Sequence, residues 1–111
     1  MSELSETGGG QHEMIQAGDL AIDLSAHRVL QGEREVALKP KEWDLLVFLT
    51  RHRGQVCTTD QILEAVWGYD YVGDSRTVAV HVHGLREKVE SDPGHPRLIE
   101  TIRGVGYRFS G

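Results

Sequence analysis

The chain has 111 residues, a length that fits one compact domain and leaves little room for a second. Apolar residues make up 39% of the chain and charged residues 26%, which are the proportions of folded soluble proteins and exclude disorder throughout. The formal net charge of −5 argues against a nucleic-acid partner unless the basic side chains gather on one surface.

Membrane and metal chemistry are not indicated by the sequence. The apolar stretches are far shorter than the roughly 20 residues that a membrane span needs, and the N-terminus lacks a signal peptide, so we expect a cytoplasmic protein. Cys57 is the only cysteine and is expected to be a small buried side chain. His81 and His83 are two positions apart, so on a helix they cannot share a metal ion, and we expect no metal site.

The N-terminal part predicts a linker followed by a small sheet. Residues 1–14 include three consecutive glycines and read as a flexible linker, and the domain is expected over 15–111. Apolar side chains alternate from Leu20 to Leu24, and two further short apolar runs follow, separated by a turn at Gly32. We therefore predict three antiparallel strands.

Three helices are predicted next. The first begins at Pro40 with Lys39 as an unusual N-cap, and ends near residues 52–53 before Gly54. Residues 58–61 form a capping-box pattern that predicts a short second helix, which stops at Gly68. Trp43 and Trp67 lie on the apolar stripes of these helices and are expected to pack in the core.

The third helix is predicted over about residues 76–90, after a turn-rich connector at 68–74. Its apolar residues recur at intervals of 4, 3 and 4, which places one stripe inward: Val78, Val82, Leu85 and Val89. Two glycines in Arg103-Gly104-Val105-Gly106 then indicate a tight hairpin between strands near 98–102 and 107–109. Strands, helices and a final hairpin in this order predict an α+β fold of the winged helix-turn-helix type.

The charge is distributed unevenly along the chain. Residues 1–74 carry 6 basic and 13 acidic side chains, whereas residues 75–111 carry 6 basic and 4 acidic ones. Charges more than about 8 Å apart are largely screened at physiological salt, so a basic face can exist on an acidic body. The segments 75–86 and 101–109 contain four arginines and no acid, which makes them the candidate surface for phosphate.

The run from Asp74 to Val82, followed by Leu85-Arg86, and the closing run from Thr101 to Phe109 resemble the OmpR/PhoB family of response-regulator effector domains. Residues 38–46 and 63–68 resemble the first and second helices of that family, so the resemblance covers about residues 18–109. It implies sequence-specific binding of double-stranded DNA for transcription, with residues 76–90 in the major groove and the wing at 101–109.

The resemblance also implies roles for individual residues. Arg76, Thr77 and His81 are expected at phosphates, and Val80 and His83 nearest the base edges. Arg86 is expected to reach the DNA backbone if its side chain extends outward. In the wing, Thr101 and Tyr107 are expected at phosphates, and Arg103, beside Gly104, in a minor groove. The connector residues Tyr69, Asp70, Tyr71 and Val72 form a possible contact with RNA polymerase.

Family members often carry paired basic residues where this chain has His83 and Gly84. We therefore expect fewer side chains to make specific contacts with bases, and we expect the monomer to bind DNA weakly. Two explanations of Gly84 stay open: close approach of the helix to the DNA backbone, or simple sequence drift. The family resemblance further implies direct-repeat sites, a weak or DNA-assisted dimer, an upstream receiver domain and a sensor kinase.

Two alternatives to promoter binding stay open at this point. The acidic overall charge also fits a winged-helix module for protein interaction, and a repressor that senses a metal or small molecule directly is a third interpretation. No phosphate-cradling GxxxxGK[ST], no HExxH and no paired nucleophile and base occur, so neither an enzyme nor a cofactor is expected.

Overall fold

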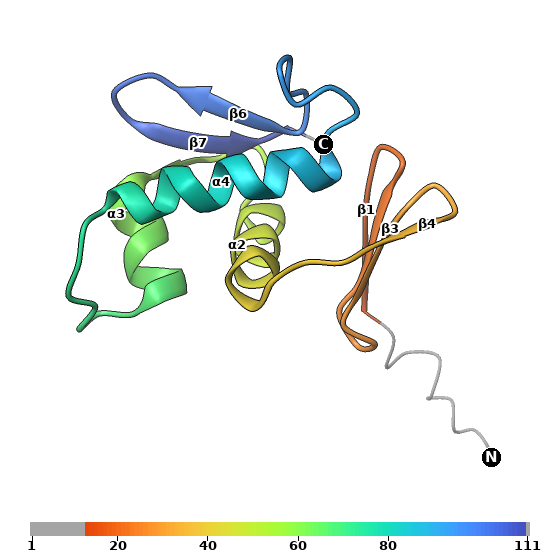
Figure 1. Ribbon diagram of the computed structural model, residues 1–111, viewed down its shortest axis with the longest axis horizontal. Helices are drawn as coiled ribbons and strands as arrows, with labels where there is room; N and C mark the ends of the chain where they lie inside the picture. The colour runs from red at the N-terminus through yellow and green to blue at the C-terminus, as the bar shows by residue number, and fades with distance from the viewer. Residues whose placement is uncertain (1–12, 111) are drawn as a thin grey trace. The chain divides into compact units, whose positions relative to one another are not determined.

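The computed structural model describes residues 13–110, which divide in sequence between Ala37 and Leu38 into two compact units. Unit 1 is an antiparallel sheet, and unit 2 contains the helices and a second sheet (Figure 1). This is the α+β architecture that the sequence predicted. Residues 1–12 of the expected linker lie outside the described residues.

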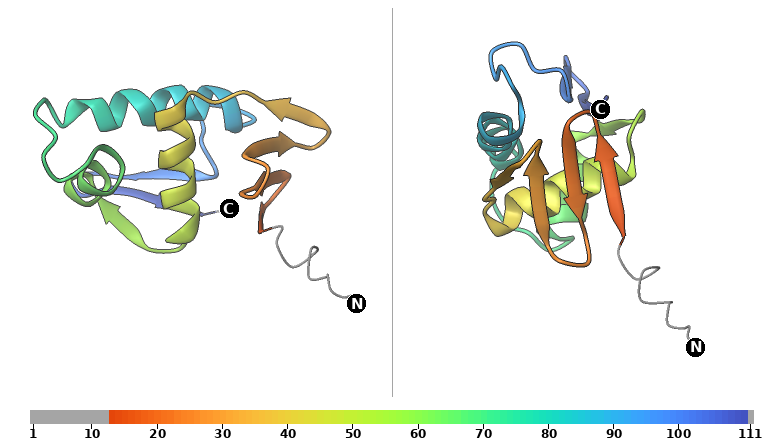
Figure 2. Two further views of the ribbon diagram at one scale, coloured as in Figure 1. Left: turned by 90° about the horizontal axis from the view of Figure 1, so that it is seen from below. Right: turned by 90° about the vertical axis from the view of Figure 1, so that its right-hand side faces the viewer.

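Unit 1 has four strands, not the three that the sequence predicted. They are β1 (Met14–Ala17), β2 (Leu20–Asp23), β3 (Arg28–Gln31) and β4 (Arg34–Val36), paired in that order (Figure 2). The overlooked strand is β1, which starts inside the segment read as linker. Only Ala17 of β1 is buried, so the strand has no alternating apolar pattern to reveal it.

One face of this sheet is buried. Ile22 stands opposite Val29, and Val29 stands opposite Val36, so these side chains share a face. All three are buried, as are Ala17 and Leu20, which are also paired across strands. The turn between β3 and β4 contains Gly32 at a φ of 62°, in agreement with the expected turn.

Unit 2 begins with α2 (Pro40–Arg51), whose first turn is capped in an unexpected way. Lys39 has no side-chain acceptor, and the Glu42 carboxylate instead accepts a hydrogen bond of 2.9 Å from the Lys39 backbone N–H. The helix ends at Arg51 with His52 as its C-cap, and Gly54 follows with a φ of 84°, close to the end that the sequence predicted.

The second helical segment is preceded by a strand that the sequence did not reveal, β5 (Val56–Thr58). Thr58 then caps α3 (Thr59–Ile62) in a reciprocal box with Gln61, with bonds of 2.8 and 3.0 Å, as expected. A π-helical turn, η1 (Leu63–Trp67), continues to Gly68, whose φ of 113° stops the helix.

The last part of unit 2 is α4 (Arg76–Val89) and the hairpin of β6 (Ile99–Ile102) and β7 (Gly106–Phe109). The hairpin was predicted, but β5 extends it to a three-stranded sheet in the order β5-β7-β6. In Figures 1 and 2, α4 runs across α2 and alongside the hairpin. The whole predicted stripe of α4 is buried: Val78, Val82, Leu85 and Val89.

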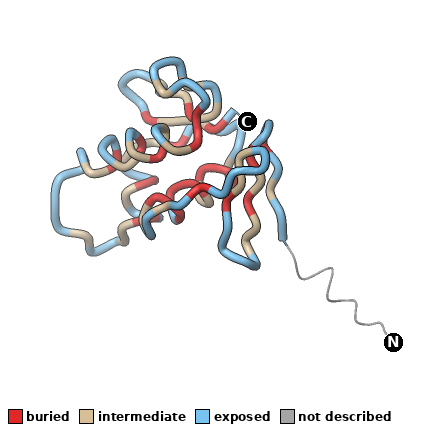
Figure 3. Tube along the Cα trace, turned by 45° about the vertical axis from the view of Figure 1, so that its right-hand side comes forward, coloured by how far each residue is buried: buried red, intermediate tan, exposed pale blue. Residues whose placement is uncertain are grey.

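The core of unit 2 is built from all of these elements. Leu45, Leu46 and Leu49 of α2 are almost fully buried, and so are Ile62 and Phe109 from the other elements. Figure 3 shows the buried positions recurring along the inner sides of the helices. Cys57 is buried as expected, and burial raises the pKa of its thiol. Trp43 is buried, whereas Trp67 is only half-buried.

Candidate nucleic-acid interface

The side of α4 away from the core is open to solvent. Arg76, Ala79, Val80 and His83 are exposed, and Val80 has 65% of its surface accessible, which is high for an apolar side chain. The predicted contact residues on this helix are therefore largely available to a partner. A helix whose core-facing side is fully buried and whose solvent-facing side is exposed and carries few charges can enter a DNA groove without unfolding.

Arg76 stands at the first position of α4 and is held by Asp74. Two guanidinium nitrogens of Arg76 lie 2.6 and 2.7 Å from the same oxygen, Oδ2 of Asp74, and Oδ1 of Asp74 accepts a 2.8 Å bond from the Arg76 backbone N–H. These hydrogen bonds from Arg76 hold the pKa of the Asp74 carboxyl below its ordinary value. Arg76 is 87% exposed, so the pair is fixed in direction while its outer face remains accessible.

Thr77 and His81 form a local hydrogen-bonded pair one turn further on. Nδ1 of His81 lies 2.8 Å from the Thr77 carbonyl oxygen, which can only accept, so Nδ1 carries the proton in this bond. The imidazole also packs edge-on against Trp67, with ring centroids 4.9 Å apart. Nε2 has no hydrogen-bond partner within residues 13–110. A phosphate oxygen can therefore be bound there only when Nε2 is also protonated.

Gly84 makes room for a carboxylate on a neighbouring helix. A Cβ at this position would lie 2.7 Å from Oε2 of Glu42. That carboxylate is only 5% exposed, and its Oε1 accepts a 2.6 Å bond from Lys88. A methyl group at position 84 would therefore have to displace the Glu42 carboxylate, which gives the glycine a reason within the fold beside the two explanations offered from the sequence.

Arg86 does not extend outward, so the condition for its predicted contact with the DNA backbone is not met here. Its guanidinium donates to the Ile99 carbonyl oxygen at 2.7 and 3.2 Å and to Thr101 Oγ1 at 2.7 Å. It also lies 5.8 Å from the centre of the Tyr107 ring. The side chain therefore joins α4 to the hairpin.

The tip of the hairpin is exposed and carries a cation. Arg103 makes no hydrogen bond or ion pair with any part of the chain that the structure describes, and Gly104 beside it has a φ of 74°. The tip lies at the same end of unit 2 as the start of α4, in both Figures 1 and 2. The two exposed arginines, Arg76 and Arg103, are thus carried by segments at one end of the unit.

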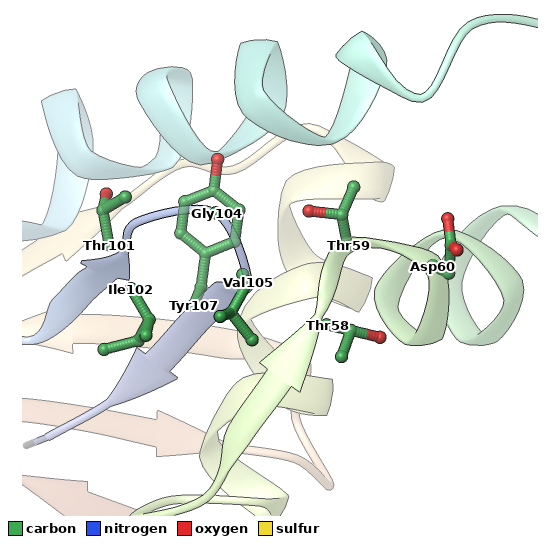
Figure 4. Close-up of a pocket in the computed structure, with 9 residues that line it drawn as sticks. Thr58, Thr59, Asp60, Thr101, Ile102, Gly104, Val105 and Tyr107 are labelled. Atoms are coloured by element: carbon green, nitrogen blue, oxygen red, sulfur yellow. The ribbon is translucent and has the colours of Figure 1, made fainter.

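A polar hollow of about 310 Å³ lies between the hairpin and the start of α3. Figure 4 shows Thr101 and Tyr107 on its hairpin side, both pointing toward α4, whereas Ile102 and Val105 point away from it. Thr58 and Thr59 lie across the hollow. Hydroxyl groups and the Asp60 carboxylate line the hollow, so it is a polar site and not a pocket for an apolar ligand.

The connector between η1 and α4 projects two apolar side chains into solvent. Tyr69 is 90% exposed and Val72 is 95% exposed, while Tyr71 packs against the Trp67 ring at 6.5 Å. Tyr71 therefore covers part of unit 2, whereas Tyr69 does not. Asp70, between them, is exposed as well.

Sequence reasoning missed two buried carboxylates that organise this surface. Glu42 pairs with Lys88, 46 positions away, and Glu90 accepts hydrogen bonds from the backbone N–H groups of residues 97, 98 and 99 at 2.8 to 3.1 Å. The helical pattern could have indicated Glu90, since it directly follows the buried stripe of α4. Among residues 13–110, no cluster of three metal-ligating side chains occurs, and no helix is long and apolar enough to cross a membrane.

A helix-turn-helix unit whose last helix lies beside a β-hairpin is a winged helix-turn-helix. Residues 33–109 match the family described as "Transcriptional regulatory protein, C terminal". The chain belongs to this family, and the resemblance to OmpR/PhoB effector domains is confirmed.

Relatives and solved structures agree with this assignment. The chain is 50% identical over 96 residues to the DNA-binding response regulator MtrA of Mycolicibacterium smegmatis, which covers 86% of this chain and 42% of that protein. It is 40% identical over 107 residues to the sensory transduction protein RegX3 of the same organism, covering 96% of this chain and 47% of that protein. The chain thus spans less than half the length of these relatives.

Two solved structures share the fold. One is the response regulator DrrB of Thermotoga maritima, an OmpR/PhoB homologue, with a TM-score of 0.82 and 36% identity over 88% of this chain and 44% of that one. The other is the DNA-binding domain of Klebsiella pneumoniae RstA in complex with the RstA box, with a TM-score of 0.81 and 35% identity over 89% of this chain and 98% of that one.

Proposed function

We propose that residues 15–111 act as a DNA-binding domain that recognises specific double-stranded sites to regulate transcription. The observation that carries the proposal is the pair of exposed arginines, Arg76 at the start of α4 and Arg103 at the hairpin tip, at one end of unit 2. The similarity to MtrA, named as a DNA-binding response regulator, and to RstA, solved with its DNA box, supports it.

In this proposal α4 enters the major groove, and the hairpin tip enters a neighbouring minor groove. Val80 and His83 face the base edges, where an apolar side chain suits a thymine methyl group. Arg76, Thr77 and the doubly protonated form of His81 contact phosphates, together with Thr101 and Tyr107 of the wing. Arg103, beside Gly104, is unpaired within the described residues and is free to approach a narrow A·T-rich groove.

Partners beyond DNA follow from the family. We propose that two copies bind direct repeats and associate weakly or only on DNA, because the single interface offers few free cations. We further propose that a receiver domain and a sensor kinase control the regulator, and that it works in the cytoplasm, where its DNA target lies. We also propose that the domain acts by binding alone, without catalysis and without a cofactor.

The proposal is tested by fluorescence anisotropy on a duplex selected from a random pool, at several salt concentrations. Arg103→Ala is expected to weaken binding and to lower the slope of log affinity against log salt by about 0.9, the value for one lost phosphate neutralisation. Arg76→Ala is expected to lower the slope by less, because Asp74 already neutralises part of its charge. Asp74→Asn, which keeps an oxygen for the cap, is expected to strengthen binding.

Arg97→Ala is the matched control for these variants. Arg97 is an exposed arginine that precedes β6, at the other end of that strand from the tip, and its side chain has no partner among residues 13–110. Its removal is expected to leave the slope unchanged. If Arg76→Ala and Arg103→Ala behave like this control, the proposal that this surface binds DNA is wrong. A winged-helix module for protein interaction then becomes the better interpretation.

We also propose that the exposed connector, with Tyr69, Asp70, Tyr71 and Val72, contacts RNA polymerase. Tyr69 and Val72 offer exposed apolar surface next to an acid, which is the composition of a small protein contact. Replacing both Tyr69 and Val72 by Ala is expected to reduce activated transcription in vitro without changing affinity for DNA. Equal transcription by the variant and the native regulator at saturating DNA occupancy would contradict this assignment.

A further inference from the structure

We infer that Arg86 is a positioning residue that fixes the wing against the recognition helix, so that both arginine-bearing segments meet one duplex. The inference rests on the proposed function, and it replaces the expected phosphate contact of Arg86 with a different role. Three observations carry it: the bonds that the guanidinium makes, the position of β6 in its sheet, and the placement of Thr101 and Tyr107.

The guanidinium makes three hydrogen bonds within the chain. Nε and one terminal nitrogen both donate to the Ile99 carbonyl oxygen, and that same terminal nitrogen also donates to Thr101 Oγ1. The planar group approaches the Tyr107 ring at 5.8 Å as well. A planar guanidinium that donates to two fixed acceptors has a defined direction, unlike a solvated arginine.

The bonds fall on an edge strand. Strand β6 pairs with β7 on one side only, so its outer N–H and C=O groups have no neighbouring strand. Arg86 takes the carbonyl of Ile99, and Glu90, one helical turn later, takes the Ile99 N–H at 2.8 Å. Arg86 of α4 and Glu90, the residue directly after α4, therefore replace the missing strand partner and bind both the C=O and the N–H of Ile99.

The same contact orients the groups that are proposed to touch phosphate. Thr101 and Tyr107 are directly paired across the hairpin and point toward α4 (Figure 4). Because Arg86 donates to Thr101 Oγ1, the hydroxyl proton of Thr101 is left to donate elsewhere, such as to a phosphate oxygen. Arg86 thus prepares the wing for DNA without contacting DNA itself.

The test compares Arg86→Ala, Arg86→Lys and the control Arg97→Ala in the same salt-dependent anisotropy assay. Arg86→Ala is expected to weaken binding about tenfold, as for a lost charge-assisted hydrogen bond, and to lower the salt slope by no more than Arg103→Ala does, because the displaced wing withdraws Arg103 from the DNA. Arg103→Ala is expected to cost much less in the Arg86→Ala background than in the native one, since a displaced wing has already lost its groove contact.

Arg86→Lys keeps the positive charge, so it distinguishes the two roles even if the alanine variant does not fold. A lysine satisfies a phosphate but cannot reproduce the planar fork, so positioning predicts that Lys fails to restore native affinity. A slope lowered by about 0.9 in Arg86→Ala, restored by Lys, would show a direct phosphate contact and overturn the inference. Failure of the proposed function can be distinguished from failure of this inference. If the proposed function is wrong, Arg103→Ala has no effect on binding in the native chain, and both proposals are then wrong.

Discussion

Replacing Gly106 by Ala is expected to destabilise unit 2 by about 3 kcal/mol or more, close to the upper range for single substitutions. Gly106 opens β7 and stands opposite Thr58 of β5. A Cβ there would overlap the Cys57 carbonyl oxygen and lie 2.8 Å from the Thr58 Cα. These are backbone atoms of a paired strand, so the clash is relieved only by separating β5 from β7.

Gly104→Ala is the matched control, two residues away in the same hairpin. Gly104 has a φ of 74° and open space around the position of a Cβ, so only backbone strain of about 1 to 2 kcal/mol is expected. Urea unfolding followed by circular dichroism measures both variants. Equal destabilisation of the two would show that β5 and β7 are not packed as closely as the structure has them.

Replacing Glu42 by Ala is expected to destabilise the protein by about 3 kcal/mol, because it removes the buried carboxylate that accepts hydrogen bonds from the Lys88 ammonium and from the Lys39 backbone N–H. Burial alone would raise the pKa of Glu42, but the hydrogen bonds from Lys88 and from the Lys39 backbone outweigh it and lower the pKa. A lowered folded-state pKa means that the charged form stabilises the fold.

The pH dependence follows from that direction. The contribution of Glu42 to the free energy of unfolding is fully present above about pH 4.3, the ordinary pKa of glutamate. It is lost as the pH falls through the lower pKa that Glu42 has in the folded state. Urea unfolding between pH 6 and 3 is expected to show a smaller loss of stability in Glu42→Gln than in the native protein. Parallel pH profiles for the two would contradict the role of this carboxylate.

Gly84→Ala probes the same contact from α4. In the native background the added methyl group must displace the Glu42 carboxylate, which offsets the better helix propensity of alanine. In the Glu42→Ala background the obstacle is gone, so Gly84→Ala is expected to stabilise the helix by about 1 kcal/mol. The difference between the two backgrounds measures the coupling of the two positions.

Elements with strong local signals could be predicted from the sequence. The stripe of α4, the reciprocal box of Thr58 and Gln61, and the glycine after α2 each depend on residues a few positions apart, and all are confirmed. The fold class followed from such signals, and the family followed from the resemblance of the runs at 74–82 and 101–109 to OmpR/PhoB effector domains. Strands β1 and β5 were missed because each is short and has one buried residue, and β5 exists through pairing with β7, about 50 positions away.

The candidate site was predictable only in part, because direction of a side chain is a tertiary property. That Arg76 and Arg103 would be exposed followed from patterns and turn chemistry. That Arg86 turns toward Ile99, and that Gly84 faces Glu42, depends on how closely α4 packs against its neighbours. Periodicity gives the buried side of a helix but not the partners of the long polar side chains at its margin.

The covering of β6 by Arg86 and Glu90 has a consequence for solubility. Strands of other molecules can pair with the exposed edge of a sheet, and proteins with such an edge aggregate unless it is blocked. Here the outward N–H and C=O of Ile99 are already engaged by Glu90 and Arg86, so an incoming chain finds no free groups at that residue. The contact that sets the wing in place therefore also protects the regulator from self-assembly along this edge.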